Sequence, residues 1–192
     1  MKLRLSLLAL FVSGNNTFAA TNQYLNINGT NDWVLVADSA SLSLSNQWTF
    51  EAWINPSQIT TNGGDPLNTI FAKPRNASGD VAFNFGLYAG FPSMGLNNGS
   101  GGNYALYSFN TPISTGQWTH LAATYDGNRI ISYVNGNAVA TGITALIVGD
   151  SNEPLYIGKE PYYYGTPPYR PFFGFMDDLP PFTGPDLMRV LV

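Results

Sequence analysis

The sequence predicts an all-β protein built as a two-sheet antiparallel β-sandwich, and three observations support this. The 192 residues include 20 glycines and 13 prolines, which is typical of many short strands joined by tight turns. Aromatic residues make up 14% of the chain and charged residues only 10%, a mix that disfavours a solvated helical bundle. About a dozen short runs alternate apolar and polar residues between turn signals. No window of about eleven residues has apolar residues at helical spacing.

The first strands are expected near residues 24–27, 33–36 and 48–55. In the run "WTFEAWI" one face of the strand is apolar, and it carries Trp48, Phe50, Ala52 and Ile54. The other face carries Thr49, Glu51 and Trp53. Pro56 is expected to end this strand, because proline cannot donate a hydrogen bond to a β-ladder.

The later strands are expected at residues 69–73, 81–88, 93–96, 104–109, 117–125, 129–134, 138–141 and 154–159. Three of them form a meander in "TGQWTHLAATYDGNRIISYVNGNAVATG", separated by the Asp126-Gly127 and Asn135-Gly136 turns. Asn135-Gly136 suits a type I′ hairpin turn, in which both central residues take positive φ.

The first twenty residues have the pattern of a secretory signal peptide. Lys2 and Arg4 precede the apolar run "LSLLALFV", and "TFAA" supplies small residues for cleavage after Ala19 or Ala20. The run is too short for a membrane span, and a buried first strand or helix is the alternative. We therefore expect residues 1–20 to be removed, and residues 21–192 to form one extracellular domain. A net charge of −4 and scattered basic residues do not suggest a nucleic-acid partner, and without cysteine there is no disulfide.

Three segments in order resemble LamG-like jelly-roll domains of the concanavalin A-like lectin/glucanase superfamily. They are "LNINGTNDWVLVADSASLSLSNQWTFEAWINP", "GQWTHLAATYDGNRIISYVNGNAVATG", and "PLYIGK" followed later by "FFGFMDDL". The resemblance implies a jelly roll in which Trp53, Trp118, Leu121 and Tyr125 pack in the core. The end departs from the family pattern, because Pro180-Pro181 cannot lie in a central strand. The last strand is thus expected to be short or at an edge, and the chain after about residue 179 to be truncated or altered.

The sequence does not favour an enzyme. The superfamily contains glucan hydrolases, whose alternating carboxylates (E-x-D-x-x-E) are missing here: Glu51, Glu153 and Glu160 are the only glutamates, and none has an Asp two residues on. His120 is the only histidine, and we expect it to be structural and hydrogen-bonded to a neighbour rather than a general base.

The resemblance also implies one structural calcium ion. In related proteins such an ion lies between an early loop and an aspartate near the C-terminal end. By position Asp177 matches that aspartate, and Asp32 is the best early partner. The alternative is that these aspartates cap turns or face solvent.

A Pro-rich stretch, "KEPYYYGTPPYRPFFG", holds four tyrosines: Tyr162, Tyr163, Tyr164 and Tyr169. Exposed rings with few charges can stack on sugars, whereas the same loop could equally fold back as a lid over a sheet edge. The sequence and the resemblance together predict a secreted, non-catalytic module that binds carbohydrate. An adhesion or structural module that binds an extracellular protein, alone or within a larger multidomain protein, is the alternative, and a hydrolase is a less favoured one.

Overall fold

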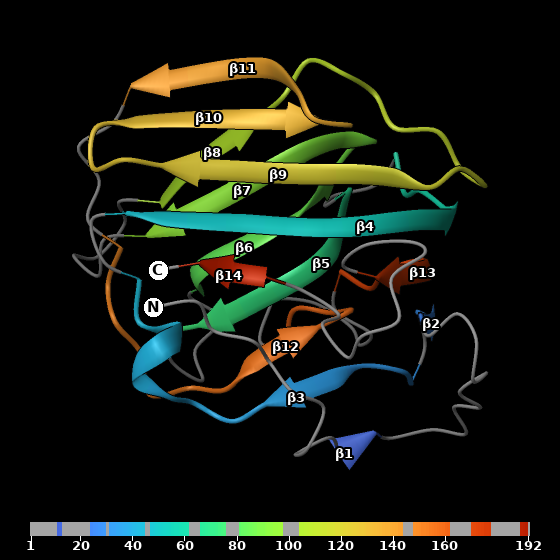
Figure 1. The fold of residues 1–192 in the computed structure, drawn as a ribbon. Helices are drawn as coiled ribbons and strands as arrows, with labels where there is room; N and C mark the ends of the chain where they lie inside the picture. Colours follow the sequence, from blue (N-terminus) through green and yellow to red (C-terminus); the bar gives the residue numbers. More distant parts are fainter. Residues whose placement is uncertain are drawn as a thin grey trace.

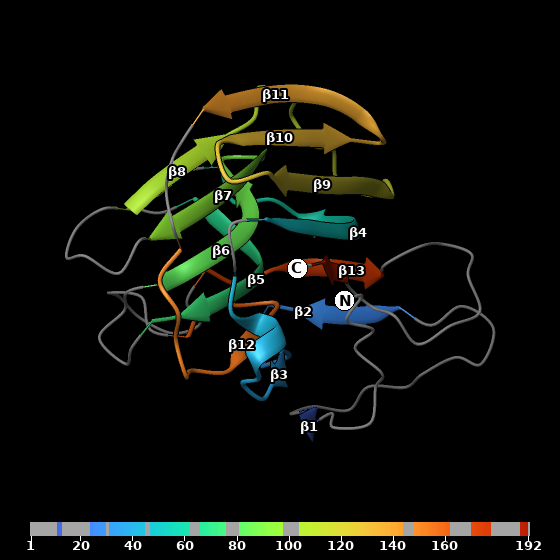
Figure 2. The same ribbon diagram turned by 60° about the vertical axis from the view of Figure 1, so that its left-hand side comes forward.

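Two antiparallel sheets pack face to face in the computed structural model, as Figures 1 and 2 show. It describes residues 11–12, 24–29, 31–44, 47–61, 66–75, 81–97, 104–143, 148–161, 170–177 and 189–191. Every strand pair in these segments is antiparallel. One short 3-10 helix, Ala40–Leu42, joins the third and fourth strands. The predicted all-β jelly-roll sandwich is confirmed.

The front sheet is the one nearer the viewer in Figure 1. Its spatial order is β11 (Asn137–Ile143), β10 (Arg129–Val134), β9 (Thr119–Tyr125), β4 (Trp48–Gln58), β13 (Phe173–Asp177) and β2 (Leu25–Asn28). The three strands of the predicted meander are therefore neighbours at one side of this sheet. The Asn135-Gly136 turn between β10 and β11 has φ of 50° and 77°, which confirms the positive φ at both positions expected for a type I′ turn.

The back sheet contains the other predicted strands. Its spatial order is β1 (Phe11–Val12), β3 (Val34–Val36), β12 (Leu155–Ile157), β5 (Leu67–Pro74), β6 (Val81–Tyr88), β7 (Phe91–Asn97) and β8 (Tyr104–Ser108). The pairing of β1 with β3 consists of two residue pairs at the sheet edge. The predicted signal peptide includes β1, and its removal stays a prediction. Among the described residues, no helix has the length and apolar character needed to cross a bilayer.

The core lies between the sheets and is centred on aromatic rings. Phe50 of β4 is fully buried, and its ring centroid lies 5.0 Å from that of Phe71 on β5 and 5.2 Å from that of Phe83 on β6. Burial of each such side chain contributes about 1.5–3 kcal/mol to stability. The alternation predicted for β4 is confirmed, because Trp48, Phe50, Ala52 and Ile54 are all buried.

Pro56 does not end β4, which continues to Gln58, so this expectation is wrong. Pro56 lies opposite Gly174 at a register shift of β13, and a bulge tolerates a residue without an N–H. Gly174 has a φ of 136°, and a β-carbon there would lie 2.2 Å from the carbonyl oxygen of Asn55. Only glycine allows the two strands to approach this closely.

The chain ends in a strand that the sequence left undefined. β14 (Arg189–Leu191) pairs with residues 49–51 of β4, next to β13 on the same side of that strand (Figure 1). It has three residues, and truncation or alteration of the chain after about residue 179 stays a prediction. Pro180 and Pro181 lie outside the described residues.

Candidate functional site

The outer face of the front sheet carries aromatic and polar side chains in alternate positions. Phe175 of β13 lies opposite Asn55 of β4 on one side and Asn26 of β2 on the other. The pairing of Ile54 with Thr119 continues by one residue to place Trp118 opposite Asn55. Trp118, Asn55, Phe175 and Asn26 thus form one row across the sheet.

A second row lies one step along the strands. Trp53 of β4 is opposite His120 of β9 and Asp177 of β13. Continuing the register of β2 by one residue places Tyr24 opposite Asp177. Because residues two positions apart on a strand are separated by about 6.8 Å, the rings of neighbouring rows lie within reach of one another. We call the set Tyr24, Trp53, Trp118, His120 and Phe175 the aromatic face.

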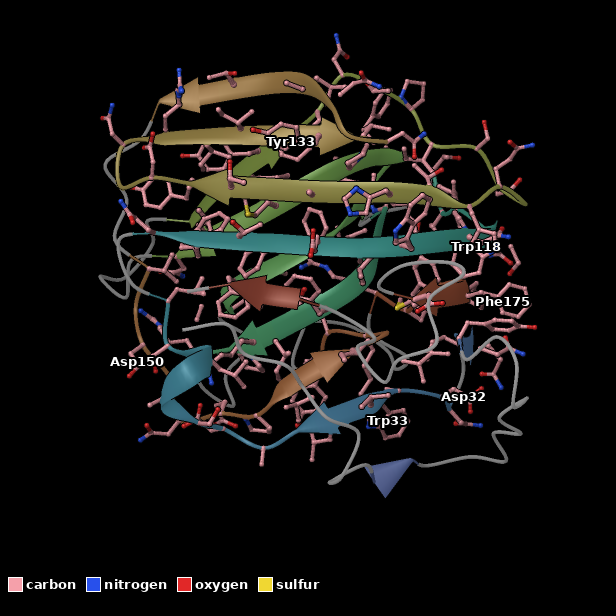
Figure 3. All side chains as sticks on the ribbon, viewed as in Figure 1. Asp32, Trp33, Trp118, Tyr133, Asp150 and Phe175 are labelled. Carbon is pink, nitrogen blue, oxygen red and sulfur yellow. The ribbon has the colours of Figure 1, made fainter. Side chains whose placement is uncertain are left out.

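Three rings at one end of the aromatic face form a platform with an upright wall. The Trp118 and Phe175 rings are 6.5 Å apart with planes inclined by 35°, and Figure 3 shows both residues at the same end of the sheet. Tyr24 stands edge-on to both rings, with its centroid 4.8 Å from Phe175 and 6.2 Å from Trp118. Its side chain is 41% exposed. Solvent therefore reaches ring surface that packing leaves uncovered.

An open hollow of about 460 Å³ adjoins this platform. Trp53, Trp118, His120, Asn135 and Gly136 line it. The type I′ turn holds Asn135 beside β9: its backbone N–H donates to the His120 carbonyl (2.8 Å), and its Oδ1 accepts from the His120 N–H (2.9 Å). The tight turn thus sets one wall of the hollow.

His120 packs on Trp53 and faces a carboxylate. The two ring centroids are 5.2 Å apart, and His120 Nε2 lies 3.7 Å from Glu51 Oε2. Trp53 Nε1 and His120 Nε2 are buried and have no hydrogen-bond partner among the described residues. Nε2 of His120 approaches Glu51 without making the expected hydrogen bond, and a structural role for this side chain stays a prediction.

Trp53 and Trp118 do not belong to the core, so this expectation is wrong. Both side chains are half-buried on the outer face, whereas Leu121 and Tyr125 are buried as predicted. The reason is strand parity: Trp53 lies on the opposite face of β4 from Phe50, and Trp118 has the same parity as His120. The alternation in "WTFEAWI" was the signal that could have identified Trp53 as an outward-facing residue.

The structure does not bring Asp32 and Asp177 together. Asp32 Oδ2 accepts a hydrogen bond from the backbone N–H of Asn28 (3.3 Å), at the end of β2 that lies opposite Phe173. Asp177 is four residues further along β13, about 14 Å away along the strand. Two carboxylates that share a calcium ion each lie about 2.5 Å from it. These two residues therefore do not fit one shared ion.

The described part of the chain contains no cluster of three or more acidic or histidine side chains suited to a metal ion. Binding of one structural calcium ion stays a prediction.

Tyr162, Tyr163, Tyr164 and Tyr169 lie outside the described residues, but both ends of their segment are described. Glu160 is buried, and both of its carboxylate oxygens accept from Arg170 Nη1 (3.0 and 2.9 Å). The Asn84 side-chain amide donates to Glu160 Oε2 (3.2 Å), and Asn84 Oδ1 accepts from the Gly95 N–H (2.9 Å). Glu160 and Arg170, which flank the segment, thus lie against β6 and β5 of the back sheet.

Two further polar features lie near β3 and β12. Lys159 Nζ is 3.3 Å from the centroid of the Trp33 ring, and burial lowers the pKa of this amine. A second hollow, of about 470 Å³, is lined by Arg75, Asp150, Ser151, Asn152 and Glu153. Figure 3 shows Trp33 and Asp150 well apart from Trp118 and Phe175. Neither feature contains the stacked rings of the aromatic face.

Comparison with solved structures identifies this fold in carbohydrate-binding domains. Domain 4 of AbnA, an extracellular arabinanase from Geobacillus stearothermophilus, in complex with arabinotriose, is 23% identical with a TM-score of 0.59 over 95% of this chain and 81% of that one. The sialidase CBM40 of Ruminococcus gnavus, bound to α2,3-sialyllactose, is 12% identical with a TM-score of 0.63, over 88% and 89% of the two chains. These likenesses establish the fold.

A putative carbohydrate-binding protein from Bacteroides ovatus is 22% identical with a TM-score of 0.56. The match covers 80% of this chain but only 42% of that protein. No curated protein matches the sequence. The family model described as the concanavalin A-like lectin/glucanases superfamily matches residues 28–183, which is most of the chain and includes strands of both sheets. The chain therefore belongs to the concanavalin A-like lectin/glucanase superfamily.

Proposed function

We propose that this protein is a secreted, non-catalytic carbohydrate-binding module that holds its glycan on the aromatic face. The single observation that carries this proposal is the half-buried platform of Trp118 and Phe175 with the exposed Tyr24 as its wall, beside an open hollow. A flat ring offers apolar area to the C–H face of a sugar with little loss of side-chain freedom. The alternate polar residues offer hydrogen bonds to sugar hydroxyls.

The similar structures support a glycan as the ligand. The arabinanase domain is in complex with arabinotriose and the sialidase domain with sialyllactose. Both are domains of enzymes with a bound oligosaccharide, which supports oligosaccharide binding by the same fold in this chain. The tyrosines of residues 162–169 remain a second proposed glycan contact.

An extracellular protein is the alternative ligand, because a ring-rich patch also suits a protein interface. In that case the module would act in adhesion, either alone or as part of a larger multidomain protein. The two ligand classes differ in what competes for the aromatic face. Soluble oligosaccharides displace a bound glycan, and they leave a protein complex intact.

A glycan array with the purified protein tests the proposal, using two tyrosines as a matched pair. Tyr24 and Tyr88 are similarly exposed, at 41% and 37%, but Tyr88 belongs to the back sheet. Tyr24→Ala should weaken glycan binding tenfold or more, whereas Tyr88→Ala should not. An equal loss of glycan affinity in both variants would overturn the proposed site. So would the absence of glycan binding in the wild-type protein.

Two simple measurements test the remaining parts of the proposal. Prolonged incubation with the bound oligosaccharide should release no reducing ends, because binding without hydrolysis is expected. Mass spectrometry of protein collected outside the producing cells should find a chain that begins at residue 20 or 21. A product that still carries Lys2 and Arg4 would contradict the signal peptide.

A further inference from the structure

This inference rests on the proposed function and concerns the length of the glycan. A third open hollow, of about 400 Å³, lies on the front sheet at the end of β4 and β9 that is opposite to the platform. Its lining includes Thr49, Thr124, Asp126, Arg129 and Ile131, and we call it the threonine hollow. We infer that it is a second sugar subsite, and that one oligosaccharide extends along β4 and β9 from the platform to this hollow.

The threonine hollow belongs to the same side of the sheet as the aromatic face. Thr49 lies four residues before Trp53 on β4, and Thr124 lies four residues after His120 on β9. Because side chains alternate along a strand, each threonine shares a face with the ring four residues away. Thr49 and Thr124 are directly opposite each other, and Thr124 is also opposite Ile131 of β10. The two hollows are thus parts of one surface.

The distance between the two ends of this surface requires an oligosaccharide. Trp118 and Thr124 are six residues apart in the chain, which along an extended strand is about 20 Å. That distance is several times the width of one sugar ring. A trisaccharide on the platform would therefore end short of the threonine hollow, whereas a hexasaccharide would reach it.

Tyr133 of β10 lies between the two hollows. Its register places it opposite Ala122 of β9, which is two residues from His120 and two from Thr124. The Tyr133 side chain is half-buried, and Figure 3 shows it on the front sheet, to the left of Trp118. A sugar chain that spans the face would therefore meet one further ring, whose hydroxyl group can donate or accept a hydrogen bond.

The side chains of the threonine hollow suit sugar hydroxyl groups. A threonine hydroxyl both donates and accepts hydrogen bonds, and the Arg129 guanidinium donates them. Asp126 Oδ1 accepts from the backbone N–H groups of Asn128 (3.0 Å) and Arg129 (2.7 Å), and these bonds hold the turn between β9 and β10. Because its own hydrogen bonds fix this turn, ligand binding has little chain to order at the hollow.

A single sugar chain gains more from the two hollows than separate sugars do. Each free sugar loses its overall motion on binding, whereas sugar units that are already joined lose it once. Extending the chain adds only the ordering of its linkages between the hollows. The structure therefore favours a ligand of several joined sugar units, bound along its length.

Calorimetry with arabinotriose and arabinohexaose tests the inference, with xylotriose and xylohexaose as a second pair. The hexasaccharide should bind about tenfold or more tightly than the trisaccharide, with one molecule per protein. This gain exceeds the few-fold increase that the additional binding registers of a longer chain supply. Equal affinities of the two lengths, or two hexasaccharide molecules per protein, would overturn the inference and leave the proposed function standing.

Two variants then assign the gain to named residues. Tyr133→Ala and Thr124→Val should each weaken hexasaccharide binding about threefold or more, and leave trisaccharide binding at the aromatic face unchanged. Thr141→Val is the matched control. Thr141 lies opposite Ile131 in the same row as Thr124, but it is not among the described residues that line the hollow.

The remaining outcomes separate this inference from the proposed function. Tyr24→Ala should weaken the binding of both lengths, because both contact the platform. An equal loss of hexasaccharide affinity in Thr124→Val and Thr141→Val, or no loss in Tyr133→Ala and Thr124→Val, would overturn the second subsite. If neither series of oligosaccharides binds, the inference fails, and the glycan array decides the proposed function separately.

Discussion

Trp53 of β4 lies directly opposite His120 of β9, with the two ring centroids 5.2 Å apart on the outer face of the front sheet. The contact joins the strand that carries Glu51 to the strand that follows Trp118. Because neither ring enters the core, their packing shapes a surface of the molecule. The hollow next to them is built from this pair, from Trp118 and from the type I′ turn.

Trp118→Ala should separate binding from stability. Trp118 is half-buried outside the core, so its loss should weaken glycan binding at least tenfold while the melting temperature changes by only a few degrees. Trp48→Ala is the matched control, because Trp48 is 2% exposed and stacks on Phe50 with centroids 4.5 Å apart. Removal of a buried tryptophan costs about 3–5 kcal/mol of unfolding free energy. Urea unfolding measures the stability of both variants, and calorimetry measures their glycan affinity. Equal destabilisation by the two substitutions would indicate that Trp118 belongs to the core.

Glu160→Ala should destabilise the fold strongly. The change leaves the Arg170 guanidinium and the Asn84 amide without their shared partner in a poorly hydrated site. Breaking a buried ion pair from one side costs about 3–5 kcal/mol. Urea unfolding measures this cost. The double variant Glu160→Met, Arg170→Met also removes the guanidinium charge that Glu160 balances, so it should recover part of the loss. A double variant that unfolds more readily than the single one would contradict this explanation.

Asp150 should stabilise the fold in a pH-dependent manner. Hydrogen bonds from the Ser43 hydroxyl (2.7 Å) and the Ser151 N–H (2.8 Å) hold the pKa of Asp150 below its ordinary value of 3.8. A carboxyl with a lowered folded-state pKa adds stability above its unfolded pKa, and that contribution disappears as the pH falls through the folded value. The melting temperature of Asp150→Asn should therefore lie below wild type at pH 6 and approach it below about pH 3. A constant difference across this range would assign the effect to something other than the charge.

Chelation should distinguish the two aspartates proposed for calcium. If the folded protein binds calcium, a chelator lowers the melting temperature by mass action. Since Asp32 and Asp177 lie at opposite ends of the β2–β13 pairing, Asp32→Ala and Asp177→Ala should not both abolish the effect. Thermal denaturation with and without chelator decides the matter. Loss of the effect in both single variants would show one shared ion and contradict the observed separation.

The sequence by itself determined the strands and the turns between them, because these depend on residues close together in the chain. The two-residue alternation in β4 and β6 follows from strand geometry, and Asn-Gly between two strands favours a type I′ turn with positive φ at both positions. The family was also evident from three segments in order. Pro56 shows where this local reasoning failed, since its place in β4 depends on the bulge opposite Gly174 of β13.

Only the tertiary structure decided which strand faces meet and which distant side chains become neighbours. Alternation separates Trp53 from Phe50, but burial of the Phe50 face depends on the back sheet, whose rings lie over it. Glu160 and Asn84 are 76 residues apart and meet through a register that no local pattern specifies. Asp32 and Asp177 are separated for the same reason. The aromatic face arises from four strands drawn from both ends of the chain, and hydrogen bonding between strands, rather than sequence proximity, sets its geometry.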